Sequence, residues 1–176
     1  MKTSVFCGVS VDGFLARLDG KFDFLEHAGS EPHGYEEFIA TVDVLVWGRN
    51  TYEVVLGFSG EWPFKKPVIV LSSGEIKPAP DGAHVEHMSG APADIFAALE
   101  ARGFEHAYID GGITIQRFLA AGLIDRLIVT RVPVLIGEGI PLFGSVPKDI
   151  LLEHVATRTY KTGLVQTEYR ISGKHE

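Results

Sequence analysis

Short apolar runs separated by amphipathic segments dominate the chain up to residue 125. Residues 4–11 are mostly apolar and β-branched and end at the turn dipeptide Asp12-Gly13, which predicts a buried first strand. Similar short runs predict buried strands at 43–47, 67–71, 84–88 and 107–110. The apolar pattern therefore predicts a sheet of several short buried strands.

Segments with apolar residues three and four positions apart lie between these strands. The spacing predicts helices over 35–42, 51–56, 92–102 and from Gly112 to about 121. Pro92 falls in the first turn of its helix, and Gly103 and Gly122 are typical of residues that end one. The segments 14–34, 57–66 and 76–82 carry glycine and proline and predict loops, of which 14–34 is typical of a substrate loop.

The pattern changes after residue 126. Strands are predicted at 127–136, interrupted by Pro133, and at 150–158 and 165–171, with a glycine-rich loop at 137–144. Strands that alternate with helices and are then followed by strands alone indicate an α/β fold. We expect a mainly parallel central sheet with an antiparallel C-terminal hairpin and flanking helices, in one domain over residues 1–176.

The composition of the chain limits the kinds of partner that the protein is expected to bind. Apolar residues make up 45% of the 176 and charged residues 22%, which is typical of a globular protein. The net charge is −7 and the Lys and Arg residues are scattered, so we expect no nucleic-acid partner. Cys7 is the one cysteine and the histidines lack metal-ligand spacing, so we expect neither a disulfide nor a metal site. No apolar stretch approaches about 20 residues, so we expect no membrane contact and a cytoplasmic location.

Three predicted strands end in polar or glycine-rich turns, at 47–51, 71–74 and 109–114. Ligands of open α/β sheets bind outside the carboxyl ends of the strands, so these turns could line one crevice. Gly111-Gly112 would let backbone N–H groups approach a pyrophosphate at a helix N-terminus. The alternative is a tight strand-to-helix turn, and the pair does not form the G-x-G-x-x-G fingerprint.

The other two turns carry side chains that suit phosphate or ribose. Arg49 presents a fork of donors at an expected helix start, although a surface Arg that caps a carbonyl is the alternative. Ser72 and Ser73 could donate to a ribose or its phosphate, or serve only as turn residues.

These three turns, in this order, resemble the cofactor-binding strand ends of the dihydrofolate reductase superfamily. Within it, residues 10–16 and 122–143 are similar to the C-terminal reductase domain of the bifunctional riboflavin-biosynthesis deaminase-reductase. The resemblance implies a three-layer dihydrofolate reductase-like fold, NADPH as cofactor and hydride donor, a small-molecule substrate and often a homodimer. The P-C-x-x-C motif that zinc deaminases require is absent from the chain.

The resemblance also implies which residues hold the cofactor. Val9, with Cys7 and Gly8, would lie near the nicotinamide, and the loop 137–139 would border the pocket. The residues implied at the adenosine 2′-phosphate are Gly48, Arg49, Asn50, Thr51, Ser72 and Ser73. Those implied at the pyrophosphate are Gly111, Gly112, Ile113 and Thr114, and Asp110 is implied as a further cofactor-binding residue.

Asp12 is the candidate catalytic residue, because its Ser-x-Asp-Gly context matches the riboflavin-pathway reductase. A turn-forming Asp before Gly is the alternative reading. The predicted function is an NADPH-dependent reductase that transfers a hydride to a small heterocycle, similar to 5-amino-6-(5-phosphoribosylamino)uracil or to a pterin. The alternatives are a nucleotide-binding, catalytically inactive regulatory homodimer and a structural homodimer whose glycine turns bind nothing.

Overall fold

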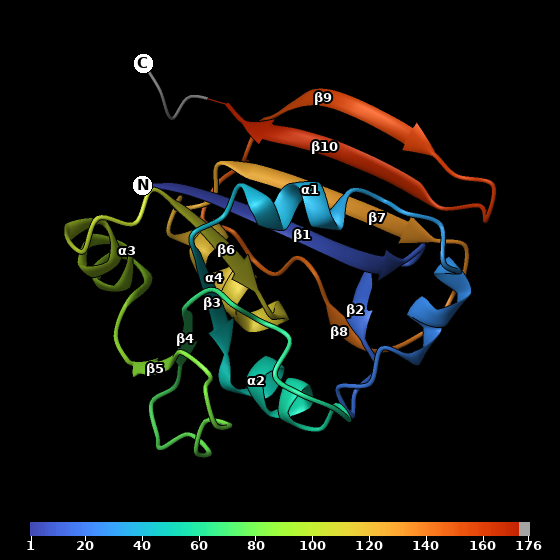
Figure 1. Ribbon diagram of the computed structural model, residues 1–176. Helices are drawn as coiled ribbons and strands as arrows, with labels where there is room; N and C mark the ends of the chain where they lie inside the picture. The colour runs from blue at the N-terminus through green and yellow to red at the C-terminus, as the bar shows by residue number, and fades with distance from the viewer. Residues whose placement is uncertain (173–176) are drawn as a thin grey trace.

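An eight-stranded sheet runs through the centre of the molecule (Figure 1). The computed structural model describes residues 1–172. In spatial order the strands are β5 (Val85–Met88), β4 (Val68–Leu71), β3 (Val44–Gly48), β6 (His106–Asp110), β1 (Lys2–Ser10), β7 (Arg126–Val132), β10 (Val165–Ile171) and β9 (Leu152–Thr159). The first six strands run parallel, whereas β10 is antiparallel to both β7 and β9. The expected parallel sheet with an antiparallel C-terminal hairpin is confirmed.

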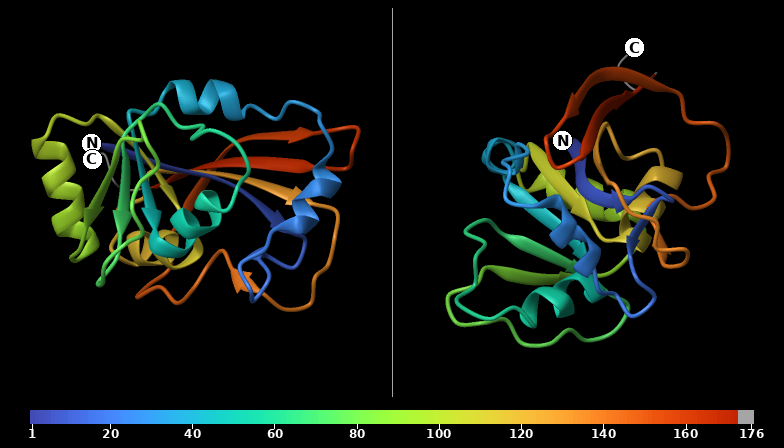
Figure 2. Two further views of the ribbon diagram at one scale, coloured as in Figure 1. Left: turned by 60° about the horizontal axis from the view of Figure 1, so that its bottom comes forward. Right: turned by 90° about the vertical axis from the view of Figure 1, so that its right-hand side faces the viewer.

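Helices cover both faces of this sheet, as Figure 2 shows for α1 and α4. The helices are α1 (Tyr35–Ala40), α2 (Arg49–Leu56), α3 (Pro92–Ala101) and α4 (Gly112–Ala120). Phe38 of α1 and Tyr52 of α2 are buried in one apolar cluster with side chains of β3 and β4. Ile95 of α3 and Ile115 of α4 are buried in a second cluster against other side chains of the sheet. Burial of this apolar surface on two sides stabilises the expected three-layer arrangement.

Two segments that the sequence predicts as loops contain regular structure. The segment 14–34 includes strand β2 (Phe14–Ala16) and the 3-10 helix η1 (Asp23–Ala28). Strand β8 (Ile140–Pro141) lies inside the predicted glycine-rich loop and pairs antiparallel with β2. Gly139 allows this approach, because a Cβ atom there would lie 2.3 Å from the carbonyl oxygen of Ala16. The loop prediction was wrong at these places because the pairing joins residues far apart in sequence.

Several predicted element boundaries were also wrong, among them the starts of α2 and β9 and the ends of β7 and α1. Strand β7 ends at Val132 and does not reach residue 136, because Pro133 has no N–H to donate to a neighbouring strand. Helix α1 ends at Ala40 and not at residue 42; the Thr41 hydroxyl donates to the Phe38 carbonyl oxygen at this end, at 2.7 Å. In the part of the chain that the structure describes, no helix has the length and apolar character needed to cross a membrane.

Candidate functional site

A cavity of about 1000 Å³ opens beyond the carboxyl ends of β3, β4 and β6. These strands are neighbours in the order β4-β3-β6, so their three terminal turns meet at one edge of the sheet. The cavity lining includes, from these turns, Gly48, Arg49, Asn50, Thr51, Ser72, Ser73, Asp110, Gly111, Gly112, Ile113 and Thr114. The three turns therefore line one cavity, as the sequence predicts.

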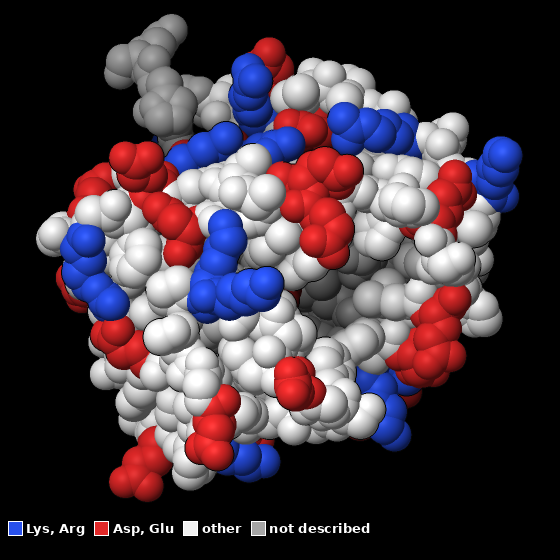
Figure 3. Space-filling model, in the orientation of Figure 1, with Lys and Arg blue, Asp and Glu red and all other residues white. Residues whose placement is uncertain are grey.

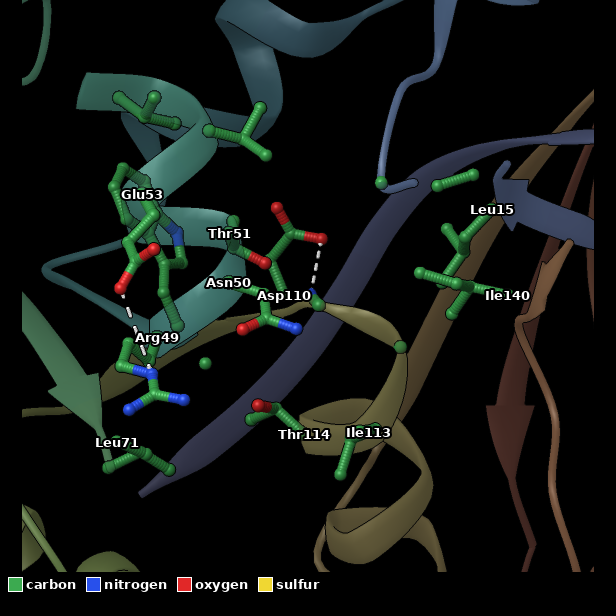
Figure 4. A pocket seen from close by; sticks show the side chains of 18 of the residues that line it. Leu15, Arg49, Asn50, Thr51, Glu53, Leu71, Asp110, Ile113, Thr114 and Ile140 are labelled. Atoms are coloured by element: carbon green, nitrogen blue, oxygen red, sulfur yellow. Dashed lines mark hydrogen bonds and ion pairs between the residues drawn. The ribbon is translucent and has the colours of Figure 1, made fainter. Parts of the chain in front are cut away.

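The N-termini of α2 and α4 lie side by side at the wall of this cavity (Figure 4). Gly111 has a φ of +96°, and a Cβ atom there would lie 2.5 Å from Thr51 Oγ1. A Cβ atom on Gly48 would lie 2.7 Å from Thr114 Oγ1, so glycine at both positions permits the close approach. Neither helix has a side-chain hydrogen bond at its N-cap. Backbone N–H groups of two first turns, with the positive ends of two helix dipoles, are thus available to an anion.

Two cationic side chains lie beside the start of α2. Arg49 Nε is 3.8 Å from Glu53 Oε1, and Lys77 Nζ is 3.6 Å from Glu53 Oε2. The Ser72 hydroxyl oxygen accepts a hydrogen bond from the Gly74 N–H at 3.1 Å, so its proton is available for another acceptor. This end of the cavity can hold a phosphate group through charge and hydrogen bonds.

Asp110 lies between this cationic end and an apolar end that includes Leu15 and Ile140 (Figure 4). Its Oδ1 atom accepts a hydrogen bond from the Gly111 N–H at 2.8 Å. Loss of hydration on burial raises the pKa of Asp110 to about 6, against the smaller lowering effects of that N–H and of the Tyr108 hydroxyl. A carboxyl group with this pKa can hold or release a proton near neutral pH, as acid–base catalysis requires.

Asp12 and Val9 lie outside the lining of the cavity. The exposed Asp12 carboxylate accepts hydrogen bonds from the N–H groups of Gly137 at 2.8 Å and Ile136 at 3.3 Å. A hydrogen bond from Ser10 and these loop N–H groups lower its pKa, so it is an anion that holds the loop after β7. Val9 is buried in the core, and any contact with a ligand falls to its backbone. The catalytic role of Asp12 stays a prediction.

In the loop 57–66, the aromatic residues Trp62 and Phe64 lie beside the cavity. Trp62 packs against Phe64, with ring centroids 5.4 Å apart, and against Trp47 at 6.1 Å. Phe64 packs on Trp47 at 4.8 Å and also lines the cavity. Trp62 thus anchors the loop, whereas Phe64 both anchors it and faces the cavity.

Sequence reasoning missed several lining residues. Lys77 stands in a proline-rich segment with no pattern that marks a ligand site, and the exposed rings of Phe22 and Phe58 belong to separate loops. No cluster of His, Cys, Asp and Glu side chains that could hold a metal ion occurs among the described residues.

Comparisons of the sequence and of the structure with known proteins point to one family. The model of the RibD C-terminal domain family matches residues 2–166. The crystal structure of a "Putative riboflavin biosynthesis protein" from Shewanella sp. PV-4 is 39% identical, with a TM-score of 0.90 over 98% of this chain and 100% of that one. The "Uncharacterized protein YwjB" of Bacillus subtilis (strain 168) is 33% identical over 165 residues, or 90% of this chain and 92% of that protein.

A more distant likeness concerns the fold alone. Dihydrofolate reductase from Enterococcus faecalis, in a complex with NADP(H), is 20% identical and has a TM-score of 0.66 over 98% of this chain and 97% of that one. The family match and these neighbours support a reductase-like fold of the dihydrofolate reductase kind. The chain belongs to the RibD C-terminal domain family.

Proposed function

We propose that the protein is an NADPH-dependent reductase of small heterocyclic compounds. The observation that carries the proposal is the meeting of two uncapped helix N-termini beside Arg49 and Lys77, in one cavity with Asp110. The residues present fit a phosphorylated dinucleotide, because the glycine turn leaves room for backbone contact and the cations suit a phosphate. A cytoplasmic location and a homodimeric state are part of this proposal.

Each phosphate group has a proposed set of partners. Arg49, with Ser72 and Ser73, would bind the adenosine 2′-phosphate, and the N–H groups of Gly112 and Ile113 would bind the pyrophosphate. When bound, the nicotinamide supplies a hydride, which is the chemistry that the protein itself lacks. The protein's part is to orient the reactants, exclude water and manage one proton.

We assign that proton to Asp110. As the carbon of a substrate C=N bond accepts the hydride, the nitrogen takes the proton of the Asp110 carboxyl, and the product is an amine with the cofactor oxidised. The carboxylate then regains a proton from water. Bound phosphates nearby would raise the Asp110 pKa above about 6, which favours the protonated form before the reaction.

Fluorescence titration tests the cofactor assignment, because Trp47 lines the cavity. We expect saturable quenching by NADPH and weaker binding of NADH. Arg49→Ala should weaken NADPH binding about 10- to 100-fold, because a charge-assisted contact contributes about 1.5–3 kcal/mol. Arg170→Ala is the control, because Arg170 is an exposed residue outside the cavity lining.

Three results would distinguish the alternatives. Loss of NADPH affinity in Arg49→Ala but not in Arg170→Ala supports the assignment. Tight NADPH binding without turnover of any heterocycle would favour the inactive regulatory homodimer. Absence of saturable binding by either dinucleotide would overturn the reductase proposal.

A further inference from the structure

The cationic side chains of the cavity are confined to one part of it. They belong to α2, to the loop after β4 and to α4, the elements that meet at the ends of β3, β4 and β6. The cationic lining residues are Arg49, Lys77 and Arg117. The proposed dinucleotide, which carries three phosphates, accounts for all of them.

The other part of the cavity, which we call the acceptor end, is apolar and aromatic. Its lining consists of Leu15, Ala16, Leu18, Asp19, Gly20, Phe22, Tyr35, Val54, Val55, Phe58 and Ile140. Among these described residues Asp19 is the one with a charge at neutral pH, and it is an anion. An apolar lining with few polar groups is typical of sites for flat organic molecules.

Phe22 and Phe58 form an exposed aromatic pair at the acceptor end. They come from the loop before η1 and the loop after α2, and their ring centroids are 6.1 Å apart with an interplanar angle of 84°. The two residues are 37% and 51% exposed, although both are large and apolar. Exposed aromatic surface beside a cavity is a common mark of ligand contact.

The basic residues nearest in sequence to this end are engaged by acids. Arg17 donates two hydrogen bonds to the carboxylate of Asp23, at 2.6 and 3.0 Å. Lys21 Nζ lies 3.0 Å from Asp19 Oδ2. Neither cation lines the cavity, so neither supplies a phosphate site there.

Charged side chains of both signs surround the hollow that Figure 3 shows between α1 and α2. Its floor is uncharged, acidic side chains lie above it where α1 lies, and basic side chains lie to its left. The first turn of α1 carries Glu36 and Glu37, both exposed. These acids lie on the α1 side of the hollow, and their like charge opposes the approach of a phosphate dianion from that side.

We infer that the hydride acceptor is a flat, neutral heterocycle without a phosphate group. The inference rests on the proposed reductase function and names the substrate class of the same cavity. It separates this chain from a reductase whose substrate is a phosphoribosyl compound, because such a substrate requires a second anion site at the acceptor end. The aromatic pair recognises the ring, and a lining whose one charged residue, Asp19, is an anion selects against phosphorylated analogues.

A matched pair of ligands tests this inference by binding alone. The protein saturated with NADP⁺ is titrated in a calorimeter with 5-amino-6-(5-phosphoribosylamino)uracil and with the same compound after its phosphate is removed. We expect the dephosphorylated compound to bind at least about ten-fold more tightly, a difference of about 1.4 kcal/mol. Equal or tighter binding of the phosphorylated compound would overturn the inference, and so would failure of both to bind.

Two phenylalanine variants supply the control. Phe58→Ala should weaken binding of the dephosphorylated ring about ten-fold while NADP⁺ affinity stays unchanged. Phe143 is also 51% exposed but lies outside the cavity lining, so Phe143→Ala should leave both affinities unchanged. Equal behaviour of the two variants would count against ring recognition at the acceptor end. If NADP⁺ itself does not bind, the proposed function fails; if it binds and the phosphorylated compound is preferred, only this inference fails.

Discussion

Gly111, between β6 and α4, can accept a side chain only with two separate energetic costs. Its φ of +96° with a ψ of +132° is a backbone conformation that L residues rarely adopt, and a side chain there costs about 1–3 kcal/mol. Its Cβ atom would lie 2.5 Å from Thr51 Oγ1, and overpacking of this kind costs about 1–3 kcal/mol more. Gly111→Ala should therefore lower the free energy of unfolding by about 2–6 kcal/mol. At about 2–4 °C per kcal/mol, the fall in Tm is roughly 4–24 °C.

Two companion variants separate these costs. Gly122 has a φ of +68° and nothing within 4 Å of its Cβ position, so Gly122→Ala carries the conformational cost alone, about 1–2 kcal/mol. Thr51→Ala removes Oγ1, and in that background Gly111→Ala should keep only its conformational cost, about 1–3 kcal/mol. Urea unfolding followed by circular dichroism measures each difference. If Gly111→Ala destabilises the protein equally with Thr51 intact and in the Thr51→Ala background, the close contact of α2 and α4 is refuted.

Three further predictions concern charge, pH and assembly. NADPH affinity should fall as pH rises through about 6, because ionised Asp110 repels phosphate, and calorimetry should find this dependence absent in Asp110→Asn. Burial lowers the pKa of His106, so the contribution of this residue to stability should be complete above pH 6.5, its usual pKa, and should be lost as the pH falls below that value. The urea midpoint of unfolding, measured against pH, should therefore fall less steeply in His106→Gln, and an unchanged pH dependence contradicts this. The outer edge of β9, where Val155 is 38% exposed, should pair with a second copy, so light scattering should find a dimer that Val155→Lys dissociates; a monomeric parent protein excludes it.

The sequence predicts the cofactor end of the cavity better than the acceptor end. Parallel strands bring their carboxyl ends to one edge, so the turns that contain Arg49, Ser72 and Gly111 had to converge once the strands were recognised. The Phe22–Phe58 pair and the position of Lys77 depend on how long loops fold over the sheet. Local periodicity carries no information about such contacts.

Asp12 illustrates a different limit of sequence reasoning. The Ser-x-Asp-Gly pattern could be recognised, but the partners of its carboxylate are the N–H groups of Ile136 and Gly137, more than 120 positions away. The same residue type serves a loop anchor and a catalytic group equally well. Asp110 was predicted as a cofactor ligand, whereas its raised pKa depends on burial that only the folded chain creates.

The small sheet of β2 and β8 contacts both ends of the cavity. Leu15 of β2 lies at the acceptor end, while a Cβ atom on Gly112 would lie 2.8 Å from Ile140 Cγ2 of β8, so this strand touches the N-terminus of α4. A ligand that orders α4 at Gly112 therefore restrains β8, and through its partner strand the wall that receives the second reactant. Because both ligands would restrain the same small sheet, we expect each to raise the affinity of the other.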